Sequence, residues 1–250
     1  MEQDKKKKLT LKDTIYIITT TALVGAVTTL AVVLAVKTAP ISEEKEQILA
    51  MQQYYNNKVF AFNVENSNLS KGQIVFIGDS ITDLYHLDDY YSDLDKATYN
   101  RGIGGDTTSG VYIRLDSSLY QIEPSKIVLM IGINDINTGK SKDEIVKNYQ
   151  DILDDIKVHL PSSMVYTMSI CPMNEDIPGY VDLVKATSTI QSINTDIKSM
   201  SESRGYQYFD LFSLLKDENN YLKKEYSADG IHLSDAGFQV WTDLVKPSLI

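Results

Sequence analysis

The chain has 250 residues, 43% of them hydrophobic, which is enough for one α/β domain with a substantial core plus an extension. Its 24 basic and 34 acidic residues give a net charge of −10, which argues against a nucleic-acid partner because such partners normally need a basic protein face. A single cysteine, Cys171, excludes an intramolecular disulfide and a zinc cluster built from thiols, and we expect it to be a small buried residue.

The N-terminus is predicted to span a membrane. Lysines at positions 5–8 and 12 precede residues 14–36, an uncharged run of 23 residues rich in Ile, Val, Leu and Ala. As a helix with a rise of ~1.5 Å per residue, this run would reach ~35 Å and cross a hydrocarbon core of ~30 Å. The alternative is a signal peptide cleaved near Ala35, but the apolar cores of signal peptides run to about 7–15 residues.

The positive-inside tendency sets the orientation of this predicted span. It places a basic tail, residues 1–13, in the cytoplasm and the rest of a single-pass cell-membrane protein outside. Residues 1–40 hold six lysines and three acidic residues, so the remaining 210 residues carry 18 basic and 31 acidic groups and are strongly acidic. Residues 37–71 are predicted to form a stalk and docking helix, because apolar residues recur at helical spacing from Ile48 to Phe62.

From residue 72 onward, five strands are predicted to alternate with helices. The first strand is predicted at 73–77, a largely apolar run rich in β-branched residues, and the others at 97–99, 127–131, 164–169 and 206–209. Apolar positions at helical spacing predict helices at 111–122, 145–160, 183–200 and 238–245. Ser141 and Glu144 form a capping box for the second helix, Gly205 stops the third, and Ser234 is the expected N-cap of the last. This order predicts a three-layer α/β/α fold with a five-stranded parallel sheet, whose active site lies at the carboxyl ends of the strands.

The loops after the first three strands contain groups suited to acyl transfer. Ser80 follows the first strand and can expose its hydroxyl at a helix N-terminus, although a plain N-cap serine has the same pattern. The second loop, residues 100–107, has three glycines whose amides can bind developing negative charge. A phosphate-binding loop is disfavoured because the Gly-Lys-Ser/Thr ending is missing. The third loop contains Asn134, which is either an oxyanion donor or a turn former.

A serine nucleophile needs a base, and the chain has three histidines. His159 ends a helix just before Pro161, where a cation complements the helix dipole, so we expect a structural role. His86 has no obvious orienting partner. His232 follows Asp229 by three residues, and this spacing lets the carboxylate hold one imidazole nitrogen while the other faces the serine.

Together these segments resemble the signature blocks of the SGNH (GDSL-like) hydrolase family, in the family's order and over essentially all of residues 72–250. Residues 78–82 resemble the nucleophile block, 100–107 the glycine block, 132–135 the asparagine block and 229–232 the Asp-x-x-His block. Residues 100–108 are especially similar to brain-type platelet-activating-factor acetylhydrolase catalytic subunits and their bacterial esterase relatives. The resemblance implies a flavodoxin-like SGNH domain at 72–250 and a preference for short acyl groups, acetyl above all. The rival α/β-hydrolase fold expects Gly-x-Ser-x-Gly, and Thr82 stands where its second glycine would be.

The resulting hypothesis is a membrane-anchored extracellular serine esterase without a metal or organic cofactor. Its substrate would be a small-molecule, glycan or lipid ester; its oligomeric state is left open. An O-acetyltransferase acting on surface glycans and a catalytically inactive glycan-binding module are the alternatives. The predicted site comprises the triad Ser80, Asp229 and His232, the oxyanion or substrate-binding residues Gly105 and Asn134, and the supporting residues Asp79 and Asn100.

Overall fold

The computed structural model describes residues 43–174 and 182–250. The chain divides into two compact units, 1–50 and 51–250, and helix α2 (Glu43–Asn66) runs from the first into the second. The predicted membrane span at 14–36 lies outside the described residues. Within the part of the chain that is described, no helix is both long and apolar enough to cross a bilayer.

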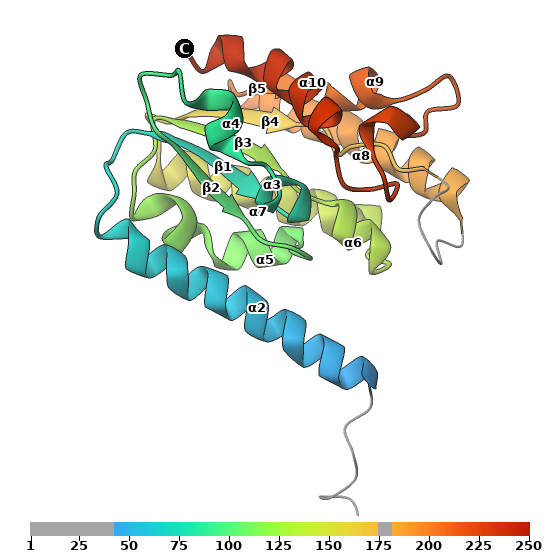
Figure 1. Cartoon of the computed structure of the whole chain (residues 1–250), viewed down its shortest axis with the longest axis horizontal. Coiled ribbons are helices and arrows are strands. Elements are labelled where there is room, and N and C mark those ends of the chain that lie inside the picture. The colour runs from blue at the N-terminus through green and yellow to red at the C-terminus, as the bar shows by residue number, and fades with distance from the viewer. Residues whose placement is uncertain (1–42, 175–181) are drawn as a thin grey trace, which may run out of the picture. The chain divides into compact units, whose positions relative to one another are not determined.

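Five parallel strands form the sheet of the larger unit (Figure 1), as the sequence predicts. They are β1 (Ile74–Gly78), β2 (Thr98–Gly102), β3 (Lys126–Met130), β4 (Met164–Met168) and β5 (Gln207–Phe209). The strand order is β2-β1-β3-β4-β5, so β1 lies between β2 and β3 and the direction of winding reverses there. A ligand site is expected at such a switch point, where the loops after the first three strands meet.

Helices cover both faces of the sheet and several begin where the sequence predicts. The main ones are α4 (Leu87–Tyr91), α7 (Lys142–His159), α8 (Leu183–Ser203), α9 (Leu211–Leu215) and α10 (Asp235–Val245). The capping box of Ser141 and Glu144 opens α7, and Ser234 is the N-cap of α10. Gly205, with a φ of +78°, follows the end of α8.

The continuous helix predicted at 111–122 is wrong. Helix α5 (Thr108–Ile113) ends at Ile113 with Arg114 as its C-cap, and a π-helical turn, η1 (Asp116–Tyr120), follows it. The side chain of Arg114 is fully buried and fixed by several hydrogen bonds, and we attribute the interruption to the turn that brings this side chain inward. The four apolar positions that suggested the helix are nevertheless all buried.

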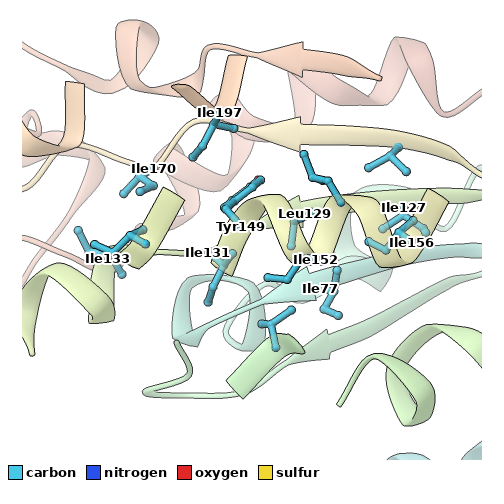
Figure 2. Close-up of a cluster of buried hydrophobic side chains, with 14 of the residues drawn as sticks. Ile77, Ile127, Leu129, Ile131, Ile133, Tyr149, Ile152, Ile156, Ile170 and Ile197 are labelled. Atoms are coloured by element: carbon cyan, nitrogen blue, oxygen red, sulfur yellow. The ribbon is translucent and has the colours of Figure 1, made fainter. Parts of the chain in front are cut away.

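Two apolar clusters pack on the two faces of the sheet. Val75 and Ile77 of β1 join the cluster beneath α5, α7 and α8, whereas Ile74 and Phe76 join the cluster beneath α4 and α10. Figure 2 shows part of the first cluster, in which Ile77, Ile127 and Leu129 of the strands lie together with Tyr149, Ile152 and Ile156 of α7. Full burial of each Val, Leu or Ile side chain stabilises the folded state by roughly 1.5–3 kcal/mol relative to an exposed side chain. Because both faces are covered, the central strands β1 and β3 read as almost continuous apolar runs without alternation.

From Met51 onward, α2 packs on the larger unit. Phe62 is buried, and the guanidinium of Arg101 lies 4.4 Å from the centre of its ring. The hydroxyl of Tyr55 donates to the carbonyl of Gly110 in α5 at 2.8 Å, and the Asn66 amide donates to the carbonyl of Ser117 at 2.7 Å. Residues 51–66 therefore lie on the α5 side of the sheet.

Candidate active site

Ser80, His232 and Asp229 form one hydrogen-bonded series. Ser80 is the first residue of α3 (Ser80–Asp83), directly beyond the end of β1, and its Oγ lies 2.9 Å from His232 Nε2. His232 Nδ1 lies 2.6 Å from Asp229 Oδ2. An ionised carboxylate can only accept, so Nδ1 carries the proton and donates to it. In a neutral imidazole, Nε2 is then unprotonated and accepts the hydrogen of the Ser80 hydroxyl.

The loop that precedes α10 fixes Asp229 in this orientation. Its Oδ1 accepts from the backbone N–H groups of Ile231 at 3.0 Å and His232 at 2.8 Å. Burial acts to raise the pKa of Asp229, but the hydrogen bonds from the His232 side chain and from these two N–H groups lower it to about 2. The carboxylate is therefore ionised at neutral pH and faces the imidazole as an anion.

Gly105 and Asn100 shape the loop that follows β2. Gly105 has a φ of +77°, a backbone conformation that residues with a Cβ adopt only at a cost. Asn100 lies behind the loop: its Nδ2 donates to the carbonyls of Thr82 at 2.6 Å and Tyr85 at 2.9 Å, and its Oδ1 accepts from the Gly102 N–H at 2.8 Å. Asn100 thus links the loop after β2, which contains Gly104 and Gly105 and is called the glycine loop below, to the α3 segment that begins with Ser80.

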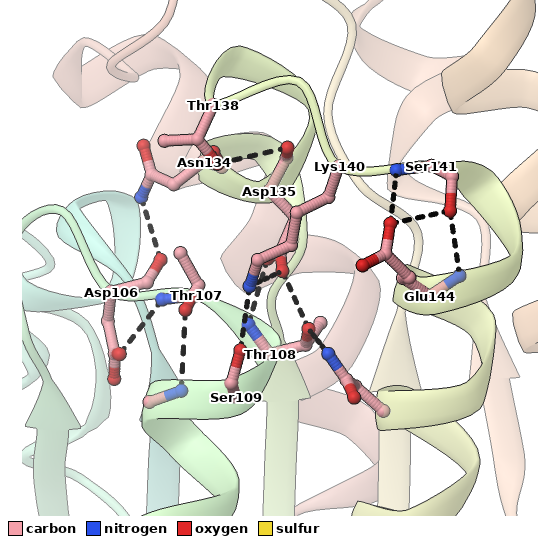
Figure 3. Close-up of polar contacts among 12 residues, drawn as sticks. Asp106, Thr107, Thr108, Ser109, Asn134, Asp135, Thr138, Lys140, Ser141 and Glu144 are labelled. Atoms are coloured by element: carbon pink, nitrogen blue, oxygen red, sulfur yellow. Dashed lines mark hydrogen bonds and ion pairs between the residues drawn. The ribbon is translucent and has the colours of Figure 1, made fainter.

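Asn134 lies in the first turn of α6 (Ile133–Asn137), beyond the end of β3. Its Nδ2 donates to the carbonyl of Asp106, the residue after Gly105, at 2.9 Å (Figure 3). An amide nitrogen carries two hydrogens, so one anchors Asn134 to the glycine loop and the second can serve a ligand. The structure therefore brings the asparagine and glycine segments together.

Two buried ionic groups, for which the sequence predicted no role of their own, hold these segments in place. Asp135 is fully buried and accepts from the backbone N–H and hydroxyl of Thr108 at 2.8 and 2.7 Å, and from Lys140 Nζ at 2.8 Å (Figure 3). Arg114 pairs with Asp106 at 2.7 Å, and the two side chains are 1% and 2% exposed. Arg114 also donates to the carbonyls of Gly78 at 2.9 Å and Arg101 at 2.8 Å. Asp135 falls in the predicted asparagine block, but its bonds to Thr108 could not be foreseen there, and no local motif marks Arg114, whose partner Gly78 lies 36 residues away.

Asp79 directly precedes the serine and is the N-cap of α3. It is buried, its Oδ1 accepts from the Ile81 N–H at 3.0 Å, and burial raises its pKa to about 7. The folded protein therefore keeps a proton that the unfolded chain releases at a lower pH.

This proton predicts a pH-dependent stability. As pH rises from about 4 to about 7, the free energy of unfolding should fall by a few kcal/mol, because the unfolded chain loses the Asp79 proton first. Asp79→Asn keeps an acceptor for the Ile81 N–H but cannot ionise, so its profile should be flatter. Urea unfolding from pH 4.5 to 8 measures the free energy of unfolding of the wild type and of Asp79→Asn. The exposed Asp95→Asn is the control, and equal slopes in Asp79→Asn and the wild type would contradict the prediction.

The remaining sequence candidates lie apart from the triad. His86 lines a cavity of 460 Å³ together with Asp83 and Asn100, and it takes no part in the hydrogen bonds that join the triad. His159 ends α7, its Nδ1 is 3.0 Å from the carbonyl of Asp155, and its ring stacks on Tyr120. Cys171 is buried, and burial raises the pKa of its thiol. Across residues 43–174 and 182–250, no group of three or more His, Cys, Asp or Glu side chains is arranged to hold a metal ion.

Comparison with known proteins supports the resemblance seen in the sequence. The bovine (Bos taurus) platelet-activating factor acetylhydrolase IB subunit alpha1 is 29% identical over 115 residues, which are 45% of this chain and 49% of the bovine protein. The match thus spans about half the length of this curated relative.

Two solved structures share the fold. A proposed platelet activating factor from Streptococcus pneumonia is 29% identical, with a TM-score of 0.76, and the match covers 84% of this chain and 100% of that chain. A GDSL-like lipase from Bacteroides thetaiotaomicron is 22% identical, with a TM-score of 0.69 and coverages of 78% and 98%; at this identity the likeness shows the fold alone. The model of the GDSL-like lipase/acylhydrolase family matches residues 76–240, which run from β1 into α10. The chain belongs to the GDSL-like lipase/acylhydrolase family.

Proposed function

We propose that the chain is a serine esterase that hydrolyses short-chain carboxylic esters, acetyl esters above all. The observation that carries this proposal is the series from Ser80 Oγ through the His232 imidazole to Asp229, with separations of 2.9 and 2.6 Å. A serine hydroxyl becomes an effective nucleophile only beside a base, and the base needs an orienting partner. Family membership supports ester chemistry, and the name of the bovine acetylhydrolase supports an acetyl group.

The proposed reaction has two acyl-transfer steps. His232 takes the Ser80 proton as Oγ attacks the ester carbonyl carbon, and Asp229 stabilises the imidazolium that forms. The bond to the alcohol oxygen then breaks, His232 returns the proton to that oxygen, and the acyl group stays on Ser80. In the second step, a water molecule gives a proton to His232 and attacks the acyl carbon. The carboxylic acid leaves and Ser80 regains its proton.

The tetrahedral intermediate of each step needs donors for its oxyanion. We assign this role to the backbone N–H groups of Ser80 and Gly105 and to the Asn134 side chain. The first two lie at adjacent strand ends, and Asn134 is anchored to the glycine loop by its bond to the carbonyl of Asp106. Preorganised donors of this kind stabilise a transition state because they need no reorientation when the charge appears.

Asn134→Ala is expected to lower kcat by about 10²- to 10³-fold, the usual effect of removing one oxyanion donor, with a much smaller change in KM. Hydrolysis of p-nitrophenyl acetate measures both constants. Asn137→Ala, at the exposed end of the same short helix, is the matched control and should be unaffected. A loss confined to KM would mean that Asn134 binds the ground state and transition state equally.

A fluorophosphonate probe tests the proposed nucleophile directly. The probe should attach to Ser80 in the folded protein, and the labelled protein should lose its activity on p-nitrophenyl acetate. Peptide mass spectrometry identifies the modified residue. A folded, active protein that is labelled on another serine, or is not labelled at all, would contradict the proposal.

We further propose that residues 14–36 anchor the protein in the cell membrane with the catalytic domain outside. The support is the uncharged run of 23 residues and the lysines that precede it. Protease added to intact cells should then digest the domain and leave a short tagged N-terminal fragment with the membrane. A full-length protein that resists protease until the cells are lysed would contradict this orientation.

A further inference from the structure

One face of α2 lies beside the glycine loop. Met51, Tyr54 and Lys58 follow one another at intervals of three and four residues, so their side chains project from the same side of the helix. A Cβ atom added to Gly105 would lie 2.9 Å from Met51 Cε. Tyr54 and Lys58 both bond to Asp83, the last residue of α3. The helix therefore supplies side chains to the rim of the site around Ser80.

The space between Tyr54 and Ser80 is narrow. A Cβ atom added to Gly104 would lie 3.5 Å from Tyr54 Cε1 and 3.9 Å from Ser80 Cβ. Both are ordinary van der Waals distances, so the gap beside Gly104 holds a group of about methyl size. Tyr54 is 42% exposed and Met51 is 58% exposed, so both present apolar surface at this rim.

Asp83 fixes the position of the Tyr54 ring. Its carboxylate accepts from the Tyr54 hydroxyl, from Lys58 Nζ at 2.7 Å and from the Gly104 N–H at 3.1 Å. The Asp83 side chain is only 15% exposed. Burial and the bond to Asp83 raise the pKa of Tyr54 to about 12, so the hydroxyl stays protonated and donates at neutral pH. The ring cannot swing away from the loop without breaking a charge-assisted hydrogen bond.

The proposed reaction turns the acyl part of an ester at Ser80 towards this helix. The alcohol oxygen takes its proton from His232, so the alcohol must lie on the His232 side. His232 precedes α10, which packs in the cluster containing Phe76. Residues 51–66 of α2 lie on the opposite side, where Tyr55 bonds to Gly110 of α5. With the alcohol on one side, the acyl chain is directed towards α2.

We propose that Tyr54 and Met51 form an apolar wall that limits the length of the acyl group accepted at Ser80. The wall leaves space for an acetyl group and obstructs longer chains. This inference rests on the proposed esterase function and assigns acyl selectivity to two residues outside the segment that matches the family model, 76–240.

The proposed wall is tested by measuring how the activity of the full-length protein depends on the length of the acyl group in its substrate. With p-nitrophenyl acetate, butyrate and hexanoate as substrates, Tyr54→Ala and Met51→Ala should each raise the kcat/KM ratio of hexanoate to acetate about tenfold, the scale on which pockets discriminate single methylenes. Tyr54→Phe keeps the ring and loses the bond to Asp83, so its ratio should rise less than that of Tyr54→Ala. Phe60→Ala, on the same helix and 71% exposed, is the matched control and should keep the wild-type ratio.

The possible failures are distinguishable. If both alanine variants keep the wild-type ratio of kcat/KM for hexanoate to acetate, together with their melting temperature and acetate activity, the proposed wall is contradicted. The proposed esterase function is then unaffected. If Tyr54→Ala unfolds, Met51→Ala decides alone, because Met51 is largely exposed and its truncation should not affect folding. A wild-type chain that hydrolyses none of these esters would contradict the proposed function itself.

Discussion

Replacing Ser80 by alanine is expected to lower kcat for p-nitrophenyl acetate by about a millionfold, the scale of removing the nucleophile from a serine triad. The reason is that His232 Nε2, which lies 2.9 Å from Ser80 Oγ, then has no hydroxyl to activate, so the acyl-enzyme cannot form. The melting temperature should change little, since Ser80 is only partly buried. Stopped or prolonged assays at high enzyme concentration measure the residual rate.

Ser92→Ala is the control for this variant, because Ser92 is exposed at the end of α4 and should leave kcat unchanged. The Ser80 variant should also no longer react with the fluorophosphonate probe. A folded Ser80→Ala protein that keeps even a hundredth of the wild-type rate would show that another group attacks the ester.

Asp229→Asn is expected to lower kcat about 10⁴-fold without loss of the fold. The asparagine Oδ1 can still accept from the backbone N–H groups of Ile231 and His232. Its NH₂ group, however, would face His232 Nδ1 and favour the tautomer protonated on Nε2, which cannot take the Ser80 proton. kcat and the melting temperature, measured together, separate this effect from unfolding.

Asp235→Asn is the matched control, since Asp235 is an exposed carboxylate in the first turn of α10, three residues beyond His232. Because the pKa of Asp229 is lowered to about 2, its charge is constant from pH 4 upward, and its protonation should not shape the wild-type pH profile in that range. Less than a tenfold loss in Asp229→Asn would mean that His232 is oriented by other contacts.

The fold could be predicted because its strands are marked by burial on both faces. Residues Ile74 to Ile77 are all fully buried, and such a run with helical patterns on either side has few alternatives to a covered parallel sheet. The interruption at Arg114 could not be predicted in this way. The spacing of the flanking apolar residues fits a continuous helix, and only the distant partners of the guanidinium reveal why it breaks.

The elements of the site could be predicted for a related reason. Loops after neighbouring parallel strands meet at one edge, so Ser80, the three-glycine loop and Asn134 could be grouped from their positions, and the family resemblance singled out Gly105 within that loop. The part played by α2 could not, because the bonds of Tyr54 and Lys58 to Asp83 join residues 25 or more positions apart with no shared motif. The membrane span at 14–36 stays a prediction.

The buried guanidinium of Arg114 ties the site to the stability of the whole domain. It bonds to the end of β1, to β2 and to Asp106 in the glycine loop. Opening that loop would leave a charge and several carbonyls unpaired in the interior, which costs several kcal/mol. The loop is therefore poorly suited to act as a gate that opens and closes during turnover. On heating, catalytic competence and the native fold should disappear in one cooperative event.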